Sequence, residues 1–245
     1  MMRTSNPALN DQTFERTSPY SGEVMTINGT VHRTAALLFL VVCGAAYTWS
    51  LTQTRGAAAA APWMVGGALG GLVFAFVTIF KKNWAPITAP MYAVLEGLFL
   101  GALSATFAAR YHGIVFQAVF LTFGTLFALL LAYRTGLIRV TANFRLGVFA
   151  ATGGIFLVYL VSWLMSLFGV NIPYIHQSGW IGIGFSLFVV VIAALNLVLD
   201  FDFIEQGATH SAPKYMEWYA AFGLMVTLIW LYVEILRLLA KLRDR

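Results

Sequence analysis

Charged side chains are scarce in this sequence. Of its 245 residues, 15 are Lys or Arg and 10 are Asp or Glu, which is 10% of the chain. Soluble domains carry about 25% charged residues. Hydrophobic residues make up 60% of the chain, so too few charges remain to cover the surface of a globular domain. The composition therefore excludes a soluble fold and indicates an integral membrane protein, with the lipid bilayer as its surroundings.

Cysteine and histidine are also too few to build a reactive site. Cys43 is the only cysteine, which excludes an internal disulfide and a CxxC metal site. The histidines, His32, His112, His176 and His210, show no metal-ligand spacing, and HExxH and GxSxG are absent. We therefore expect no enzyme, no cofactor and no assigned metal site. The net charge of +5 is spread between apolar segments, so it does not indicate a nucleic-acid partner.

Long apolar segments are abundant. A membrane-spanning helix needs about 20 apolar residues. Seven segments qualify, at residues 35–52, 62–80, 87–109, 114–133, 146–170, 179–206 and 216–241. The linkers are short, so neighbouring helices should be antiparallel. We predict an all-α seven-transmembrane helix bundle as a single domain over 35–241. A polar N-terminal tail, 1–34, precedes it and a short basic end, 242–245, follows.

The basic residues between the segments favour one orientation. With the tail inside the cell, nine Lys or Arg residues fall inside and six outside, which agrees with the positive-inside rule. The inside set is Arg3, Arg16, Arg33, Lys81, Lys82, Arg134, Arg139, Arg145 and Lys214. The basic C-terminus, RLLAKLRDR, argues for the opposite side, so the side of the C-terminus stays open.

Acidic residues within the apolar segments are the main functional signal. An ionised carboxylate at the centre of a membrane helix costs roughly 2.5–3.5 kcal/mol or more, so such side chains face protein or water. Three acids fall in the stretch NLVLDFDFIEQG at 196–207, which stays apolar between them as a membrane helix would. The acids in or beside the segments are Glu96, Asp200, Asp202, Glu205, Glu217 and Glu234.

The depths of these acids separate them into groups. At 1.5 Å per residue, Glu96 lies about 13 Å inside its segment, near mid-bilayer. Asp200 lies roughly 9 Å inside its helix end, at a depth that overlaps that of Glu96. Glu234 is about 27 Å along the last helix and belongs near the opposite face. Arg237, three residues further on, would be its intrahelical ion-pair partner.

Two interpretations of Glu96 stay open: a protonated, hydrogen-bonded packing residue, or an acid of an ion pathway. Asp200 and Asp202 are ~200° apart on a helix, so they face different neighbours. We expect Asp200 to face the bundle interior, because Asn196 extends its polar stripe. The role of Asp202 stays open. We expect Glu205 at the inner mouth, solvated or capping the helix.

The chemistry of such a cluster permits proton sensing and cation passage. Burial and a second nearby carboxylate both favour the protonated form, so a cluster holds a shared proton. Losing that proton adds negative charge, which attracts cations. Carboxylates are also the usual hard ligands of calcium. Protons and calcium are therefore the gating and permeant ions that we consider.

Four stretches carry a resemblance to a known family. They are MTINGT at 25–30, YAVLEGLFLG at 92–101, LDFDFIE at 199–205 and WLYVEILRLL at 230–239. With the seven-segment layout, they make residues 25–242 resemble the bacterial branch of the Bax-inhibitor (TMBIM) family. The resemblance implies six helices around a central last helix, and a multi-pass protein of the bacterial inner membrane.

The resemblance also implies a function, a pH-sensitive calcium leak channel. In such a channel an aspartate of the sixth helix pairs with one of the seventh, and protonation of the pair gates the pore. The sixth-helix acid corresponds to Asp200. The seventh-helix position corresponds to Thr227, which cannot ionise, so the two-aspartate pair is not intact. Glu96 and Asp202 are the candidates to replace the missing partner.

A second hypothesis involves no conduction. The protein would bind other membrane proteins, such as a protease or a stress-response factor, through its tail and its basic C-terminus. Deleting the tail would then abolish function, whereas substituting the acids would have little effect.

Overall fold

The computed structural model describes residues 23–168 and 179–244, and nearly all of their regular structure is helical. One isolated bridge joins Val24 to Pro213. The elements are α2 (Ile27–Arg55), α3 (Ala57–Phe80), the short 3-10 helix η1 (Lys82–Trp84), α4 (Ala85–Arg110), α5 (Ile114–Arg134), α6 (Ala142–Leu167), α7 (Trp180–Thr209) and α8 (Met216–Arg243). Seven helices of this described part are long and apolar enough to cross a membrane, which confirms the predicted fold class.

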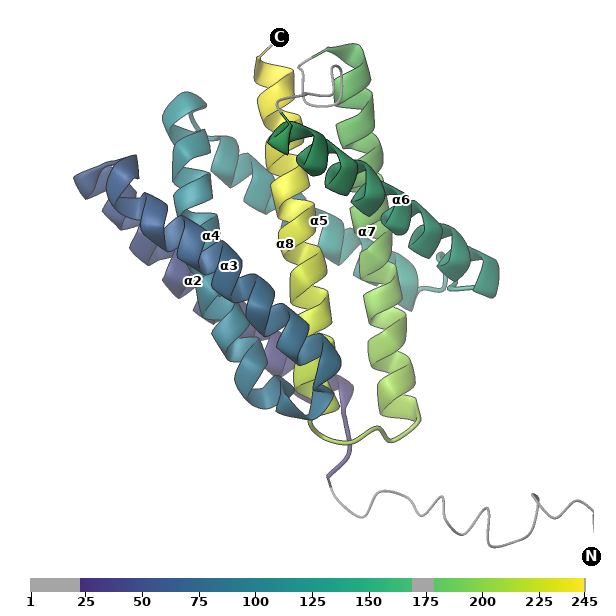
Figure 1. Ribbon diagram of the computed structural model, residues 1–245. Helices are drawn as coiled ribbons and strands as arrows, with labels where there is room; N and C mark the ends of the chain where they lie inside the picture. Colours follow the sequence, from purple (N-terminus) through teal and green to yellow (C-terminus); the bar gives the residue numbers. More distant parts are fainter. Residues whose placement is uncertain (1–22, 169–178, 245) are drawn as a thin grey trace, which may run out of the picture.

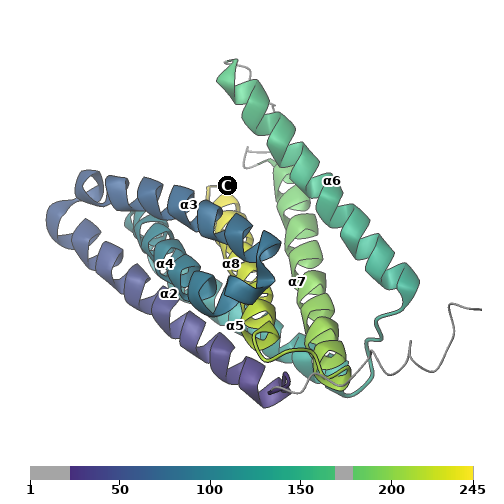
Figure 2. The same ribbon diagram turned by 60° about the horizontal axis from the view of Figure 1, so that its bottom comes forward.

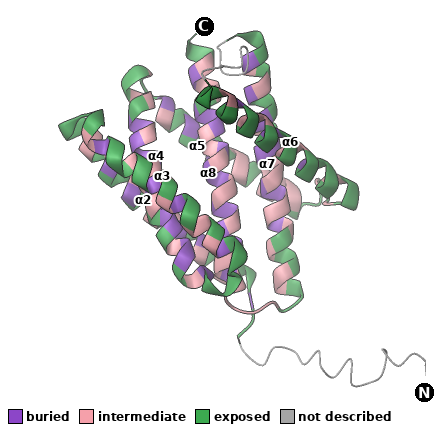
Figure 3. Cartoon of the chain, viewed as in Figure 1, coloured by how far each residue is buried: buried purple, intermediate pink, exposed green. Residues whose placement is uncertain are grey.

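The last helix, α8, lies at the centre of the bundle (Figure 1). Over its most apolar 18 residues, α8 is 56% buried, against 17% for α3, α5 and α6. It packs against α2, α4, α5 and α7. Helix α3 packs mainly on α2 and α4, and α6 lies at the edge beside α7 (Figure 2). Four helices therefore contact α8, whereas α3 and α6 lie at the outside of the bundle on different sides of it and carry many exposed residues (Figure 3).

The first helix begins at Ile27, whereas the sequence places the end of the polar tail at residue 34. Thr26 caps it by accepting a hydrogen bond from the Gly29 amide, at 2.9 Å. The hydroxyl groups of Thr30 and Thr34 donate to carbonyls one turn earlier in the same helix, so their burial leaves no polar group unpaired. Of the predicted tail, residues 1–22 lie outside the described part.

Helices α2, α3 and α4 approach one another closely because glycines line their contacts. A Cβ atom on Gly97 of α4 would lie 2.4 Å from the Val41 carbonyl oxygen of α2, and one on Gly101 would lie 2.1 Å from that of Ala45. No side chain fits at either position. This is the close backbone contact that small residues spaced by four permit in lipid. It fixes α4, and with it Glu96, relative to the rest of the bundle.

Candidate functional site

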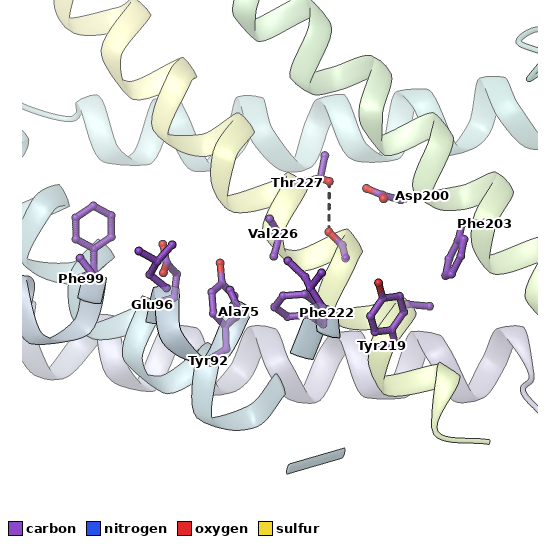
Figure 4. Close-up of a pocket in the computed structure, with 15 residues that line it drawn as sticks. Ala75, Tyr92, Glu96, Phe99, Asp200, Phe203, Tyr219, Phe222, Val226 and Thr227 are labelled. Atoms are coloured by element: carbon purple, nitrogen blue, oxygen red, sulfur yellow. Dashed lines mark hydrogen bonds between the residues drawn. The ribbon is translucent and has the colours of Figure 1, made fainter. Parts of the chain in front are cut away.

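A pocket of about 680 Å3 lies among α3, α4, α7 and α8, in the half of the bundle near Met216 (Figure 4). Helix α3 faces α7 and α8 across it. The lining contains two carboxyl groups and no Lys, Arg or His. The lining residues are Ala68, Leu72, Ala75, Ile79, Tyr92, Glu96, Phe99, Asp200, Phe203, Tyr219, Ala220, Phe222, Gly223, Val226 and Thr227.

Asp200 reaches the pocket from α7. Its Oδ2 atom is buried and has no hydrogen-bond partner among the described residues. Buried carboxylate oxygens nearly always have a partner, so this one is an exception that needs an explanation. Asp200 Oδ1 lies above Gly223 of α8, where an added Cβ would come within 3.9 Å. That distance is ordinary van der Waals contact, so the Asp200 carboxyl group lies directly beside α8 at Gly223.

Thr227 lies on α8 one turn beyond Gly223 and lines the same pocket. Its hydroxyl donates to the Gly223 carbonyl oxygen at 3.3 Å, the bond drawn in Figure 4. The α8 position expected to carry the partner acid thus lies next to Asp200, but it holds a hydroxyl group bonded to its own helix.

Glu96 enters the pocket from α4. Its carboxyl group packs against Gly71 of α3, where an added Cβ would lie 2.9 Å from Glu96 Oε2. Figure 4 shows Glu96 and Asp200 on either side of the α8 segment that carries Phe222 and Val226. The two acids that the depth estimate groups together therefore line one pocket, from two different helices.

Asp202 does not line this pocket. Its Oδ2 accepts hydrogen bonds from Arg145 of α6 and from Gln206, both at 2.7 Å. Asp202 and Asp200 therefore face different neighbours, in agreement with their angular separation on α7. Glu205, one turn further, is exposed and accepts a hydrogen bond from the Tyr133 hydroxyl.

Asn196 does not extend the polar surface of Asp200 into the pocket. Its Nδ2 donates to Thr152 Oγ1 of α6 and to the Ile192 carbonyl oxygen, both at 2.8 Å. The two residues lie one turn apart on α7, but Asn196 contacts α6 whereas Asp200 lies next to α8. The predicted polar stripe is therefore divided between two neighbouring helices.

Glu234 forms a separate, fully paired site on α8. It is 1% exposed, and Arg237 Nη1 lies 2.8 Å from its Oε1. The Tyr159 hydroxyl of α6 lies 3.1 Å from both carboxylate oxygens. The arginine three residues on is visible in the sequence. Tyr159 is not, because no local pattern connects residues 75 positions apart.

Glu217 is a second paired acid, and sequence reasoning gave it no role. It is 1% exposed, and its Oε1 accepts hydrogen bonds from the Thr26 amide at 3.0 Å and the Thr26 hydroxyl at 2.9 Å. Lys214 Nζ lies 3.1 Å from the same oxygen. Arg33 Nε lies 3.9 Å from the other carboxylate oxygen, Oε2, which accepts no hydrogen bond within the described residues. Together with the bond from the Met25 amide to the Ala212 carbonyl, at 2.7 Å, these contacts fix the chain before α2 to the α7–α8 turn. Met25 and Thr26 belong to the MTINGT stretch, which the sequence marks only as part of the family resemblance.

The fold and these sites define a multi-pass integral membrane protein, with acids held by cations at two places and with Glu96 and Asp200 in one pocket, where Asp200 Oδ2 has no hydrogen-bond partner among the described residues. A family model described as "Bax inhibitor 1 like" matches residues 6–244, and the chain belongs to this family. The resemblance to the Bax-inhibitor family is thereby confirmed at the level of the family. No curated protein and no solved structure matches the chain.

Proposed function

We propose that the protein is a pH-sensitive cation leak channel, with calcium as its expected permeant ion, gated by protonation of Asp200 and Glu96. One observation supports this proposal above the others. Carboxyl groups from α4 and α7 line a single pocket without a Lys, Arg or His, and Asp200 Oδ2 has no partner among the described residues. An acid with no fixed counter-charge is free to exchange a proton for a cation.

The chemistry gives the sign of the pH dependence. When both acids are ionised, two like charges share a low-dielectric pocket, and a cation entering it is strongly attracted. Protonation removes that attraction. The other ionisable groups at the pocket are the phenols of Tyr92 and Tyr219, with Lys82 at the rim, 5.3 Å from the Tyr219 ring centroid. Since these remain neutral or cationic, calcium flux should fall as the pH falls.

A layer of apolar side chains separates the pocket from the opposite end of α8. Beyond Thr227, the side chains of Leu228, Leu231 and Ile235 are buried and belong to one hydrophobic cluster with α5 and α7. An ion crossing the bundle has to pass this layer. In the proposed mechanism, ionisation of the pocket acids draws water and cations into the pocket. Their presence next to the apolar layer favours opening of the layer.

The pocket lies at the end of the bundle where the N-terminal segment meets the α7–α8 turn. Lys82 of η1 lies at the same end. By the positive-inside rule this end faces the cytoplasm. We propose the inner membrane of a bacterium as the location, on the resemblance to the bacterial branch of the family.

Calcium flux into proteoliposomes, measured between about pH 6 and 8, tests the proposal in the range where physiological proton switches operate. We expect flux that rises with pH in the wild-type protein and loses most of its pH dependence in Asp200→Asn. Asp202→Asn is the matched control, because Asp202 lies two residues away and is paired with Arg145 outside the pocket. Absence of flux at every pH would refute conduction and favour a binding partner for the tail.

A further inference from the structure

The pocket is larger and more apolar than an inorganic ion requires. Its volume, about 680 Å3, falls in the range of roughly 300–1,000 Å3 that is typical of small-molecule sites. Ten of the fifteen lining residues carry no polar side-chain atom. Walls of this kind gain most from contact with the apolar body of an organic ligand.

The polar groups of the pocket select the charge of that ligand. They are the carboxyl groups of Glu96 and Asp200, the phenols of Tyr92 and Tyr219, and the hydroxyl of Thr227. No lining residue is basic. Asp200 Oδ2 is an acceptor that no described residue fills. A donor with a positive charge satisfies both the unfilled acceptor and the negative charge.

A tightly chelated divalent ion does not fit this donor set. Calcium takes six to eight oxygen ligands. Within the described residues, no group of three or more His, Cys, Asp or Glu side chains gathers around a common point. A primary ammonium group has only three hydrogens to donate, so it needs fewer oxygen partners than calcium and is better matched to a carboxylate surrounded by apolar walls.

Aromatic rings form part of the pocket lining. Tyr92 and Phe222 meet edge to face with ring centroids 5.0 Å apart, and Phe203 and Tyr219 lie 6.2 Å apart. The ammonium group of Lys82 lies 5.3 Å from the Tyr219 ring centroid, within cation–π range. A ring of the pocket thus already holds a primary alkylammonium group from the protein itself.

We propose that this pocket is a binding site for an amphipathic organic cation, a primary ammonium group on an apolar body. The ammonium group donates to Asp200, and the apolar body lies along the wall formed by α3 and α8. This inference goes beyond the proposed leak function. Binding needs no passage of ions, so it is measured directly and holds or fails independently of calcium flux.

The probe is octylammonium, applied to the protein reconstituted in lipid nanodiscs at about pH 8. Equilibrium binding is measured with radiolabelled probe, and empty nanodiscs correct for partition into lipid. We expect one saturable site per chain, with affinity reduced about tenfold or more by Asp200→Asn and unchanged by Asp202→Asn. Octanol, which has the same chain without the charge, should not compete.

Ala75→Leu provides a second variant that keeps both acids. Ala75 lines the pocket from α3, so a leucine there takes up space that the octyl chain would occupy. We expect it to weaken octylammonium binding about tenfold while ethylammonium is unaffected, because a short chain does not reach the wall. The proposal is overturned by the absence of saturable binding above empty nanodiscs, by equal competition from octanol, or by unchanged affinity in Ala75→Leu.

Discussion

Two carboxyl groups, Glu234 on the central helix α8 and Asp200 on its neighbour α7, differ in the partners that surround them. Glu234 is 1% exposed and is held by Arg237 on its own helix and by the Tyr159 hydroxyl of α6. Asp200 faces a pocket, and its Oδ2 has no partner among the described residues. The cost of burying a charge is offset at the first site by neighbours in the protein. At the second it is left for a proton or a cation to offset.

Under the proposed function, this difference separates structural acids from functional ones. A carboxylate with a fixed arginine and a fixed hydroxyl gains little from binding a proton, and it ties two helices together. A carboxylate without such partners exchanges protons and cations with little rearrangement of its surroundings. Glu217 belongs with Glu234, because Thr26 and Lys214 contact its Oε1 and Arg33 Nε lies 3.9 Å from its Oε2. Its Oε2 accepts no hydrogen bond within the described residues, as is true of Asp200 Oδ2, so the two cationic neighbours distinguish Glu217 from Asp200. Substitutions should therefore destabilise the paired sites and leave the pocket site stable.

The largest loss of stability is expected for Glu217→Ala. The substitution removes a buried acceptor from the Thr26 amide, the Thr26 hydroxyl and Lys214, and it releases the chain before α2 from the α7–α8 turn. We expect a loss of about 3 kcal/mol of unfolding free energy, measured by denaturant titration in detergent. Glu205→Ala, at an exposed acid, should change it by less than about 0.5 kcal/mol. Equal effects at the two positions would show that the contacts of Glu217 do not stabilise the fold.

A smaller loss is expected at the second paired site. Arg237→Ala leaves Glu234 buried without its cation, but Arg237 itself is 49% exposed, so solvent weakens the pair. We expect a loss of about 2 kcal/mol, and about 1 kcal/mol for Tyr159→Phe, which removes one hydroxyl donor. The same titration measures both. If Tyr159→Phe cost more than Arg237→Ala, the hydroxyl and not the cation would be the main partner of Glu234.

The smallest effect is expected in the pocket. Asp200→Asn removes a charge whose Oδ2 has no hydrogen-bond partner among the described residues, and the amide oxygen of the asparagine keeps an acceptor beside the Thr227 side chain. We expect the unfolding free energy to change by less than about 1 kcal/mol. If it changes, we expect it to increase, because a buried charge is removed. A loss of about 2 kcal/mol or more would mean that Asp200 is a structural acid like Glu234, and the comparison between the two sites would not hold.

The sequence predicts the number of spans and the depth of the acids, because apolar runs and the rise per residue determine both. That depth makes a shared pocket of Glu96 and Asp200 possible, and the structure shows both residues lining one. The neighbours of each helix face do not follow from it. Asn196 and Asp200 lie on one side of α7, yet they contact different helices. Tyr159 and Thr26 reach their acids across long separations, which periodicity within one helix does not reveal.

Infrared difference spectroscopy tests most directly whether Asp200 exchanges protons while Glu234 does not. Spectra of the reconstituted protein are compared between about pH 6 and 8, where physiological proton switches operate. We predict a carboxyl signal that disappears in Asp200→Asn and persists in Glu234→Gln. A signal that persists in Asp200→Asn and disappears in Glu234→Gln would contradict the assignment of Asp200 as the proton-exchanging acid.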